Sequence, residues 1–310
     1  MPKVLFTTSS FDLNNFKEID LLNSLGFESV INPYGKRLTE DQVAGLLDED
    51  VVGMVAGLEP LTDRVLRGAK GLKVISRCGI GIDNVDTNAV GDLGIALYNT
   101  PDAPTRAVAE LTLAHILSLS RRISESDRMV RNGEWQSLMG SLLSRQTVGL
   151  IGFGRIGKMV KGLLEAFGTE VIFYDKYYKS DGQLESLSLN ELLTLSDIVS
   201  VHVPYDTETH HIINADSIRL MKPGAVLINV ARGGLIDEKA LLEALKSGKL
   251  SGAALDCFET EPYDGPLTKL KNVQISAHMG SYAKEARSMM ETEACKWLME
   301  GLRKQGIIKD

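Results

Sequence analysis

Short apolar runs alternate with segments of helical spacing along the first hundred residues. The apolar runs cover residues 4–6, 51–56, 73–76 and 95–98. A capping residue such as Thr39, followed three positions later by Gln42, marks the start of an intervening helix. Strands that alternate with helices form a parallel sheet with helices on its faces. The pattern therefore predicts an α/β domain at the start of the chain.

A second alternating series begins near residue 147. Its apolar runs cover residues 148–151, 171–174, 198–203, 226–229, 252–255 and 273–275. Six strands with helices between them match a complete doubly wound sheet. Between the two series, residues 105–130 carry an apolar face, which predicts a long helix with a break near Ser124. Residues 282–303 predict a final helix that would be free to return to the first domain.

A glycine motif follows the first strand of the second series. Gly152 would allow a tight turn from strand to helix, Gly154 would let backbone approach a pyrophosphate, and Gly157 would let the helix pack closely. The pyrophosphate would then lie at the helix N-terminus. Such a motif is weak by itself, but here an apolar strand precedes it and an amphipathic helix follows. The context predicts a dinucleotide site.

An acidic residue, Asp175, ends the next predicted strand, about 20 residues beyond the glycines. A carboxylate there would accept hydrogen bonds from the adenosine ribose hydroxyls and would repel the extra phosphate of NADP. Asp175 therefore favours NAD, although Lys176 leaves some use of NADP open. The alternative is that Asp175 only starts a turn.

Three polar residues each follow a predicted strand, where ligands of open α/β sheets bind. Arg232 lies in a glycine-flanked turn and could clamp a carboxylate through two hydrogen bonds. Glu261 and His278 follow strands that should be neighbours; a carboxylate beside an imidazole fixes its tautomer and stabilises its protonated form. This pair suits proton exchange with a substrate hydroxyl beside a nicotinamide. Alternatively, Arg232 is a surface residue and His278 is structural.

The first domain contains a candidate anion site. The segment from Arg77 through Gly79, Ile80 and Gly81 follows a strand, and its backbone N–H groups could converge on a substrate carboxylate. A simpler interpretation is a glycine turn followed by a helix that Asp86 caps, and both can hold at once.

Composition narrows the function classes. The chain has 310 residues, 44% hydrophobic and 24% charged, with a net charge of −7 and no basic block, so neither nucleic acid nor membrane is an expected partner. The start of the chain lacks the pattern of a signal peptide. Cys78, Cys257 and Cys295 lack paired spacing, which favours a reducing cytoplasm. No metal site is expected, because neither a carboxylate nor a thiol cluster accompanies His210 and His211.

These motifs together resemble the D-isomer-specific 2-hydroxyacid dehydrogenases, in the branch similar to D-3-phosphoglycerate dehydrogenase, and the resemblance covers essentially the whole chain. It rests on residues 77–86, 108–111, 152–175, 202–204, 229–233, 256–262 and 278–280.

The resemblance implies that Arg232 orients the substrate carboxylate, Glu261 supports His278, and His278 is the acid and base. It also implies an NAD site lined, besides the glycines, by Arg155, Ile156, Asp175, Pro204, Val230, Ala231, Asp256 and Gly280. The expected architecture is a Rossmann-type doubly wound sheet at 101–281, inserted into a smaller flavodoxin-like α/β substrate domain at 1–100, with the final helix at 282–310 returning to it. Members are typically homodimers joined through the nucleotide-binding domain and the long helix.

Two departures from the family pattern bear on the substrate. No asparagine precedes the Val-Ala-Glu motif at 108–110, so any contact made by that amide is absent. A phosphate-binding arginine found in some phosphoglycerate dehydrogenases is missing near residues 55–59, where Glu59 would repel a phosphate, although Lys36, Arg37 or Arg77 could compensate. The chain also ends soon after the final helix, so we expect no C-terminal regulatory domain.

We therefore expect an NAD-dependent enzyme that interconverts a small D-2-hydroxy acid and its 2-keto acid, with 3-phosphoglycerate, hydroxypyruvate and glyoxylate as candidate substrate types. The main alternative is an NAD-sensing scaffold of the corepressor type, which shares the fold and the three polar residues. Oxidation of formate or phosphite is a lesser alternative, because formate enzymes usually have glutamine where Glu261 stands.

Overall fold

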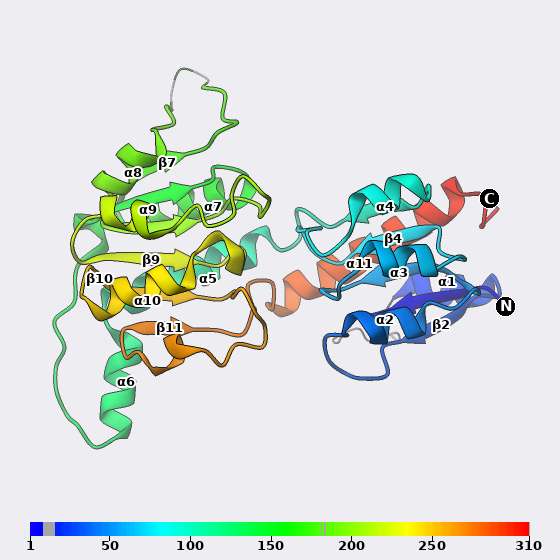
Figure 1. Ribbon diagram of the computed structural model, residues 1–310, viewed down its shortest axis with the longest axis horizontal. Coiled ribbons are helices and arrows are strands. Elements are labelled where there is room, and N and C mark those ends of the chain that lie inside the picture. The colour runs from blue at the N-terminus through cyan, green and yellow to red at the C-terminus, as the bar shows by residue number, and fades with distance from the viewer. Residues whose placement is uncertain (9–15, 181, 183, 310) are drawn as a thin grey trace. The chain divides into compact units, whose positions relative to one another are not determined.

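The computed structural model describes residues 1–8, 16–180, 182 and 184–309. The chain forms two compact units: unit 1 consists of Met1–Pro104 and Ser281–Asp310, and unit 2 of Thr105–Gly280. The chain therefore leaves unit 1 after Pro104 and returns to it after Gly280. Each unit has a parallel sheet of its own (Figure 1).

Unit 1 contains a parallel sheet with the strand order β2-β1-β3-β4-β5. The strands are β1 (Lys3–Phe6), β2 (Glu28–Ile31), β3 (Val51–Ala56), β4 (Val74–Arg77) and β5 (Ala96–Asn99). This is the flavodoxin-like order, so that expectation is confirmed. The sequence pattern missed β2, because this edge strand has no fully buried residue that would mark an apolar run.

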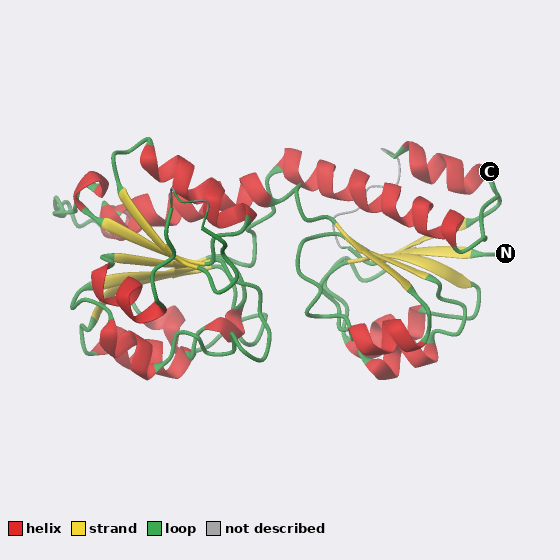
Figure 2. Ribbon diagram, turned by 90° about the horizontal axis from the view of Figure 1, so that it is seen from above, coloured by secondary structure: helices red, strands yellow, loops and turns green. Residues whose placement is uncertain are grey.

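Helices cover both faces of the unit 1 sheet (Figure 2). They are α1 (Lys17–Ser24), α2 (Glu40–Leu46), α3 (Asp63–Gly68), α4 (Thr87–Asp92) and α11 (Lys284–Lys304). Successive strand residues point to opposite faces: Val4 and Phe6 pack with α1 and α11, whereas Leu5 packs with α2, α3 and α4. The predicted capping box of Thr39 and Gln42 begins α2, and Asp86 caps α4, so both signals are confirmed.

Unit 2 contains a parallel sheet with the order β11-β10-β9-β8-β6-β7. Its strands are β6 (Thr147–Ile151), β7 (Glu170–Tyr174), β8 (Ile198–Val201), β9 (Ala225–Asn229), β10 (Leu250–Leu255) and β11 (Val273–Ile275). The expected doubly wound sheet is confirmed. Among the described residues, β7 lies at one edge of this sheet.

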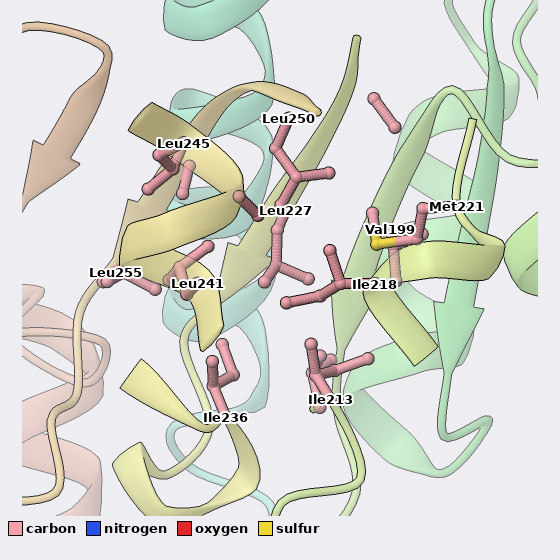
Figure 3. Packing of buried hydrophobic residues seen from close by; sticks show 14 of the residues in the cluster. Val199, Ile213, Ile218, Met221, Leu227, Ile236, Leu241, Leu245, Leu250 and Leu255 are labelled. Atoms are coloured by element: carbon pink, nitrogen blue, oxygen red, sulfur yellow. The ribbon is translucent and has the colours of Figure 1, made fainter. Parts of the chain in front are cut away.

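Two helix layers sandwich the unit 2 sheet. The helices are α5 (Thr105–Ser120), α6 (Ile123–Arg131), α7 (Arg155–Glu165), α8 (Leu189–Leu195), α9 (Ala215–Leu220) and α10 (Glu238–Lys246). Ile228 faces α5 and α7, and its neighbour Leu227 faces the core beneath α8, α9 and α10. Figure 3 shows the core beneath α8, α9 and α10, in which Ile218 and Leu241 pack from the helices toward Leu227.

The long helix expected over 105–130 is interrupted. α5 ends at Ser120 and α6 begins at Ile123, with Arg122 between them in the left-handed conformation (φ 53°). The break lies two residues before the expected position at Ser124. Among the described residues, no helix combines the length and apolar character needed to cross a membrane.

Candidate active site

The glycine motif forms the turn between β6 and α7. Gly152 has φ +101°, and a Cβ there would lie 2.7 Å from the carbonyl carbon of His202. A Cβ on Gly157 would lie 2.3 Å from the Gly152 carbonyl oxygen. Gly154 caps α7, and apart from its chain neighbours no described residue has an atom within 4 Å of such a Cβ. The turn therefore leaves open space at the N-terminus of α7, as a bound pyrophosphate requires.

Asp175 follows β7 and is tied to the glycine turn. Its carboxylate accepts hydrogen bonds from Phe153 N at 2.8 Å and from Tyr177 N at 2.9 Å. The next residue, Lys176, places its Nζ 2.6 Å from a carboxylate oxygen of Glu208. Asp175 thus lies beside the glycine turn, where a dinucleotide ribose binds in this fold, and the neighbouring lysine is paired.

The other residues expected to line the cofactor site follow the carboxyl ends of the strands. Arg155 and Ile156 begin α7, and Pro204 is exposed after β8. The remaining residues come after β9, β10 and β11: Val230, Ala231, Asp256 and Gly280. The β6 and β8 ends adjoin at the point where the chain changes direction across the sheet, and this is where such folds bind dinucleotides.

The turn that carries Arg232 is held by Asn229, the last residue of β9. Asn229 is buried; its Nδ2 donates to the Arg232 carbonyl oxygen at 2.8 Å, and its Oδ1 accepts from Ala231 N at 3.0 Å. Arg232 Nη1 donates to the Ala231 carbonyl oxygen at 2.8 Å. The buried amide therefore determines where the guanidinium leaves the sheet.

Glu261 and His278 lie in direct contact. His278 Nδ1 is 3.0 Å from Oε1 and 2.9 Å from Oε2 of Glu261. Phe258 N also donates to Oε1, at 3.1 Å, which fixes the carboxylate. Since a carboxylate accepts hydrogen bonds, Nδ1 must carry the proton of the neutral ring. The lone pair of the neutral ring then belongs to Nε2.

Asp256, at the end of β10, organises the loop that presents His278. Its carboxylate is fully buried and accepts from Met279 N at 2.9 Å, Gly280 N at 2.8 Å and Ser276 Oγ at 2.5 Å. The Asp256 carbonyl oxygen accepts from His278 N at 2.8 Å. His278 itself has φ +50°, which is costly for a residue with a side chain. These four hydrogen bonds offset that cost.

The loops of Arg232, Glu261 and His278 adjoin one another. Cys257 Sγ contacts the Ala231 carbonyl oxygen at 3.4 Å, and its possible ligand atom lies within 4.8 Å of those of Glu261 and His278. The sequence motifs predicted these three residues from their places after strands, and the structure brings their loops together at the carboxyl edge of unit 2.

Three residues around this edge were not predicted from the sequence. Asn229 supports the Arg232 turn, and Ser276 bridges Asp256 to His115, whose Nε2 lies 3.2 Å from Ser276 Oγ. Burial lowers the pKa of His115. For each of these three residues, the sequence contained one signal: a polar residue at the end, or on the face, of an otherwise apolar element.

In the candidate anion site of unit 1, some of the hydrogen-bond donors already have partners within the protein. Gly79 N donates to Thr100 Oγ1 at 2.8 Å. The Arg77 side chain is buried and donates from Nη1 to the Cys78 carbonyl oxygen. The Gly79 N–H is therefore used in a hydrogen bond within the protein. The expected substrate contacts of Arg77, Ile80 and Gly81 stay predictions.

Glu59 does not face outward, contrary to the expectation that it would repel a phosphate. Its side chain is 1% exposed. The carboxylate accepts from Thr7 Oγ1 and, at 3.0 and 3.1 Å, from Gly57 N. Burial raises the pKa of this carboxyl group. Glu59 instead closes the turn after β3.

The other histidines of unit 2 have partners in the fold. His202 Nε2 lies 2.9 Å from Ser200 Oγ, and burial lowers the pKa of His202 to about 4. His211 Nε2 lies 2.7 Å from Glu259 Oε1, and the ring of His210 stacks on that of His211.

Comparisons with known proteins agree with this geometry. A family model described as "D-isomer specific 2-hydroxyacid dehydrogenase, NAD binding domain" matches residues 113–280. The chain is 41% identical over 273 residues to D-3-phosphoglycerate dehydrogenase of Methanocaldococcus jannaschii, covering 85% of this chain and 52% of that protein. It is 39% identical over 273 residues to glyoxylate reductase of Thermococcus litoralis, covering 82% of each.

A solved structure has the same fold over nearly the full length. D-lactate dehydrogenase from Aquifex aeolicus, complexed with NAD and lactic acid, gives a TM-score of 0.83 with 30% sequence identity, covering 98% of this chain and 96% of that one. The chain spans about half the length of the M. jannaschii relative and most of the other two. The expected family and the expected cofactor, NAD, are confirmed. The chain therefore belongs to the D-isomer specific 2-hydroxyacid dehydrogenases, oxidoreductases that act on the CH–OH group of 2-hydroxy acids.

Proposed function

We propose that His278 is the acid and base of a 2-keto acid reductase and 2-hydroxy acid dehydrogenase, with Arg232 as the anchor of the substrate carboxylate. The observation that carries the proposal is the contact of His278 Nδ1 with both oxygens of Glu261. It holds the proton on Nδ1 and leaves Nε2 to exchange a proton with the substrate oxygen.

In the direction of reduction, the Arg232 guanidinium orients the substrate carboxylate through paired N–H donors. Protonated His278 then donates from Nε2 to the carbonyl oxygen as that oxygen gains charge, and Glu261 stabilises the ring while it is protonated. Bound NADH supplies the hydride. In the direction of oxidation, neutral His278 accepts the hydroxyl proton.

The residues proposed to hold NAD fit that group. Gly154 leaves the space in front of α7 open, and Asp175 lies beside the turn to accept the ribose hydroxyls. The remaining proposed contacts are Gly152, Arg155, Ile156, Gly157, Pro204, Val230, Ala231, Asp256 and Gly280.

The substrate is proposed to be a small 2-keto or 2-hydroxy acid, with glyoxylate, hydroxypyruvate and 3-phosphohydroxypyruvate as the first candidates. The buried carboxylate of Glu59 removes one objection to the phosphorylated acid, since its charge is engaged by Thr7 and Gly57. Arg37 and Lys36 would be the nearest cations in sequence to the carboxyl end of β2.

The test is NADH oxidation, followed by absorbance, against a panel of 2-keto acids that contains these three with pyruvate, 2-ketoglutarate and branched acids. NADPH is run in parallel. We expect turnover with NADH on at least one small 2-keto acid. NADH binding without turnover on the whole panel would contradict the proposal and would favour the NAD-sensing scaffold.

We further propose that the protein is a homodimer joined through unit 2. None of the side chains of α6, which the structure describes throughout, is buried. The segment after it exposes Trp135 at 91% and Met139 at 88%, and Leu142 is also exposed. In Figure 1, α6 projects below the sheet of its own unit, and the segment after it runs back along the side of that unit. Large apolar side chains that are exposed in this way are typical of an interface.

Sedimentation analysis tests the dimer. The native chain should sediment as a dimer, and Trp135→Glu should shift it toward the monomer, whereas the same change at exposed Tyr177 should not. A native monomer at micromolar concentration would contradict the proposal.

We also propose a cytoplasmic location. Among the described residues, Cys78, Cys257 and Cys295 form no disulfide, as a reducing compartment favours. Cell fractionation would test this, and recovery with an oxidising compartment would contradict it.

A further inference from the structure

A thiol, a carboxylate and an imidazole come together at the carboxyl edge of unit 2. One ligand atom from each of Cys257, Glu261 and His278 lies within 4.8 Å of the others. Thiolate, imidazole and carboxylate are the three protein ligands that Zn²⁺ prefers. The cluster joins two loops, since Cys257 and Glu261 follow β10 and His278 follows β11.

The spacing suits one divalent ion after a small adjustment. Zn²⁺ binds sulfur at about 2.3 Å and nitrogen or oxygen at about 2.1 Å, so tetrahedral ligands lie roughly 3.5 Å apart. His278 Nδ1 and the Glu261 carboxylate are already 2.9 to 3.0 Å apart. A shift of about 1 Å or less in the side chains brings all three ligands to bonding distance.

The three side chains differ in their exposure to solvent, and this difference indicates from which side an ion would reach the cluster. The Glu261 and His278 side chains are 18% and 23% exposed, and Cys257 is 2% exposed. An ion would therefore arrive from the side of the carboxylate and the imidazole, and the thiol would form the base of the site. The thiolate and the carboxylate supply two negative charges that balance the ion.

We propose that Cys257, Glu261 and His278 form an inhibitory site for Zn²⁺ and similar thiol-binding divalent ions. On binding, the Cys257 thiol releases its proton to solvent, and neutral His278 contributes the lone pair of one ring nitrogen. If that nitrogen is Nδ1, its proton moves to Nε2, so no oxidation or reduction is involved. A water molecule completes the fourth position.

The expected inhibition rests on the proposed role of His278. The ion takes a lone pair that the ring needs in order to accept a proton, and it removes the carboxylate from Nδ1. Whichever ring nitrogen binds, His278 can no longer alternate between its neutral and protonated forms. Cys257 is the residue that distinguishes this site from an ordinary carboxylate and histidine pair, because two ligands alone bind Zn²⁺ weakly.

No pattern in the sequence indicated this site. The expectation of no metal site rested on the surroundings of His210 and His211, which lack a carboxylate or thiol cluster. The three ligands are spread over 22 positions from 257 to 278, and only the pairing of β10 with β11 brings them together.

The test combines binding and inhibition on the whole protein, kept reduced with a phosphine that does not chelate metals. Co²⁺ replaces Zn²⁺ as the spectroscopic probe, because bonding to a thiolate gives Co²⁺ a charge-transfer absorption in the near ultraviolet. The native protein should show this absorption at one equivalent of Co²⁺, and Zn²⁺ should inhibit turnover until a chelator restores it.

Cys257→Ala should abolish the Co²⁺ absorption and raise the Zn²⁺ concentration for half-inhibition at least tenfold, since even indirect supporting residues of metal sites contribute about 10-fold to 100-fold in affinity. Cys257→Val, which fills the site better, guards against a loss of packing. Cys295→Ala removes another buried thiol and should behave like the native protein.

Two results would overturn the proposal. One is a native protein without Co²⁺–thiolate absorption, and the other is a Cys257→Ala variant that keeps the native absorption and the native Zn²⁺ sensitivity. If no 2-keto acid is turned over, the proposed function fails, but the Co²⁺ spectra of the native and Cys257→Ala proteins still decide whether the metal site exists.

Discussion

Replacement of Asp256 by asparagine should disable the loop of His278 while changing the size of one buried side chain very little. The Asp256 carboxylate accepts from Met279 N, Gly280 N and Ser276 Oγ, and it has no exposure to solvent. In the best orientation of the asparagine, its oxygen keeps the bonds to Met279 and Ser276. Its NH₂ group then faces the N–H of Gly280, so two donors meet.

The size of the effect follows from these bonds. A hydrogen bond to a charged group contributes about 1.5 to 3 kcal/mol, and a neutral one about 1 kcal/mol. Asp256→Asn loses the first kind at Gly280 and weakens two others. We expect a loss of roughly 3 kcal/mol in the free energy of unfolding, and the left-handed conformation of His278 is the first feature to relax. A displacement of about 1 Å at a reacting group lowers turnover by about 10²-fold.

The assay measures both quantities on one preparation. Urea unfolding of the whole protein, followed by circular dichroism, gives the change in stability, and kcat is measured with the best 2-keto acid of the panel. Asp264→Asn is the matched control, because Asp264 is exposed near the same loop. A surface change of this kind should alter stability by less than about 0.5 kcal/mol.

The reasoning would be refuted by an Asp256→Asn variant whose kcat and unfolding free energy both match those of Asp264→Asn. A loss of stability with normal kcat would show that Asp256 holds the fold but does not position His278.

Three further predictions follow from other contacts. His278→Ala should lower kcat by about 10²-fold or more, with NADH binding retained in a fluorescence titration; normal turnover would remove His278 from catalysis. Burial raises the pKa of Glu59 above its ordinary 4.5, so its contribution to stability is present below that value and is lost as the pH rises through the raised pKa. Urea unfolding should therefore show that Glu59→Gln loses less stability than the native chain over this rise; equal losses would contradict it. Glu208→Gln should free Lys176 for the extra phosphate of NADPH and raise the NADPH-to-NADH ratio of kcat/KM by about fivefold; an unchanged ratio would show that Asp175 alone sets the preference.

Local patterns in the sequence were sufficient for much of the fold. The apolar run at 226–229 and the glycines from Gly152 to Gly157 act through neighbours a few positions away, so they predict β9 and the turn before α7 directly. The rule that parallel strands end at one edge then predicted the neighbourhood of Arg232, Glu261 and His278. The sequence pattern did not predict β2, because an exposed edge strand needs few buried residues.

The tertiary structure decided how particular atoms in those loops are used. The sequence suggested that Glu59 would repel a phosphate, but the residue is buried in contact with Thr7, 52 positions away. The sequence suggested that the Gly79 N–H would bind an anion, but it donates a hydrogen bond to Thr100. Cys257 reads as an isolated thiol, but strand pairing brings it beside His278. The sequence by itself determined most of the elements and the edge at which chemistry occurs, because periodicity and turn signals are local. Which donors, acceptors and ligands are used depends on distances of a few ångströms between distant segments, and only tertiary packing sets those distances.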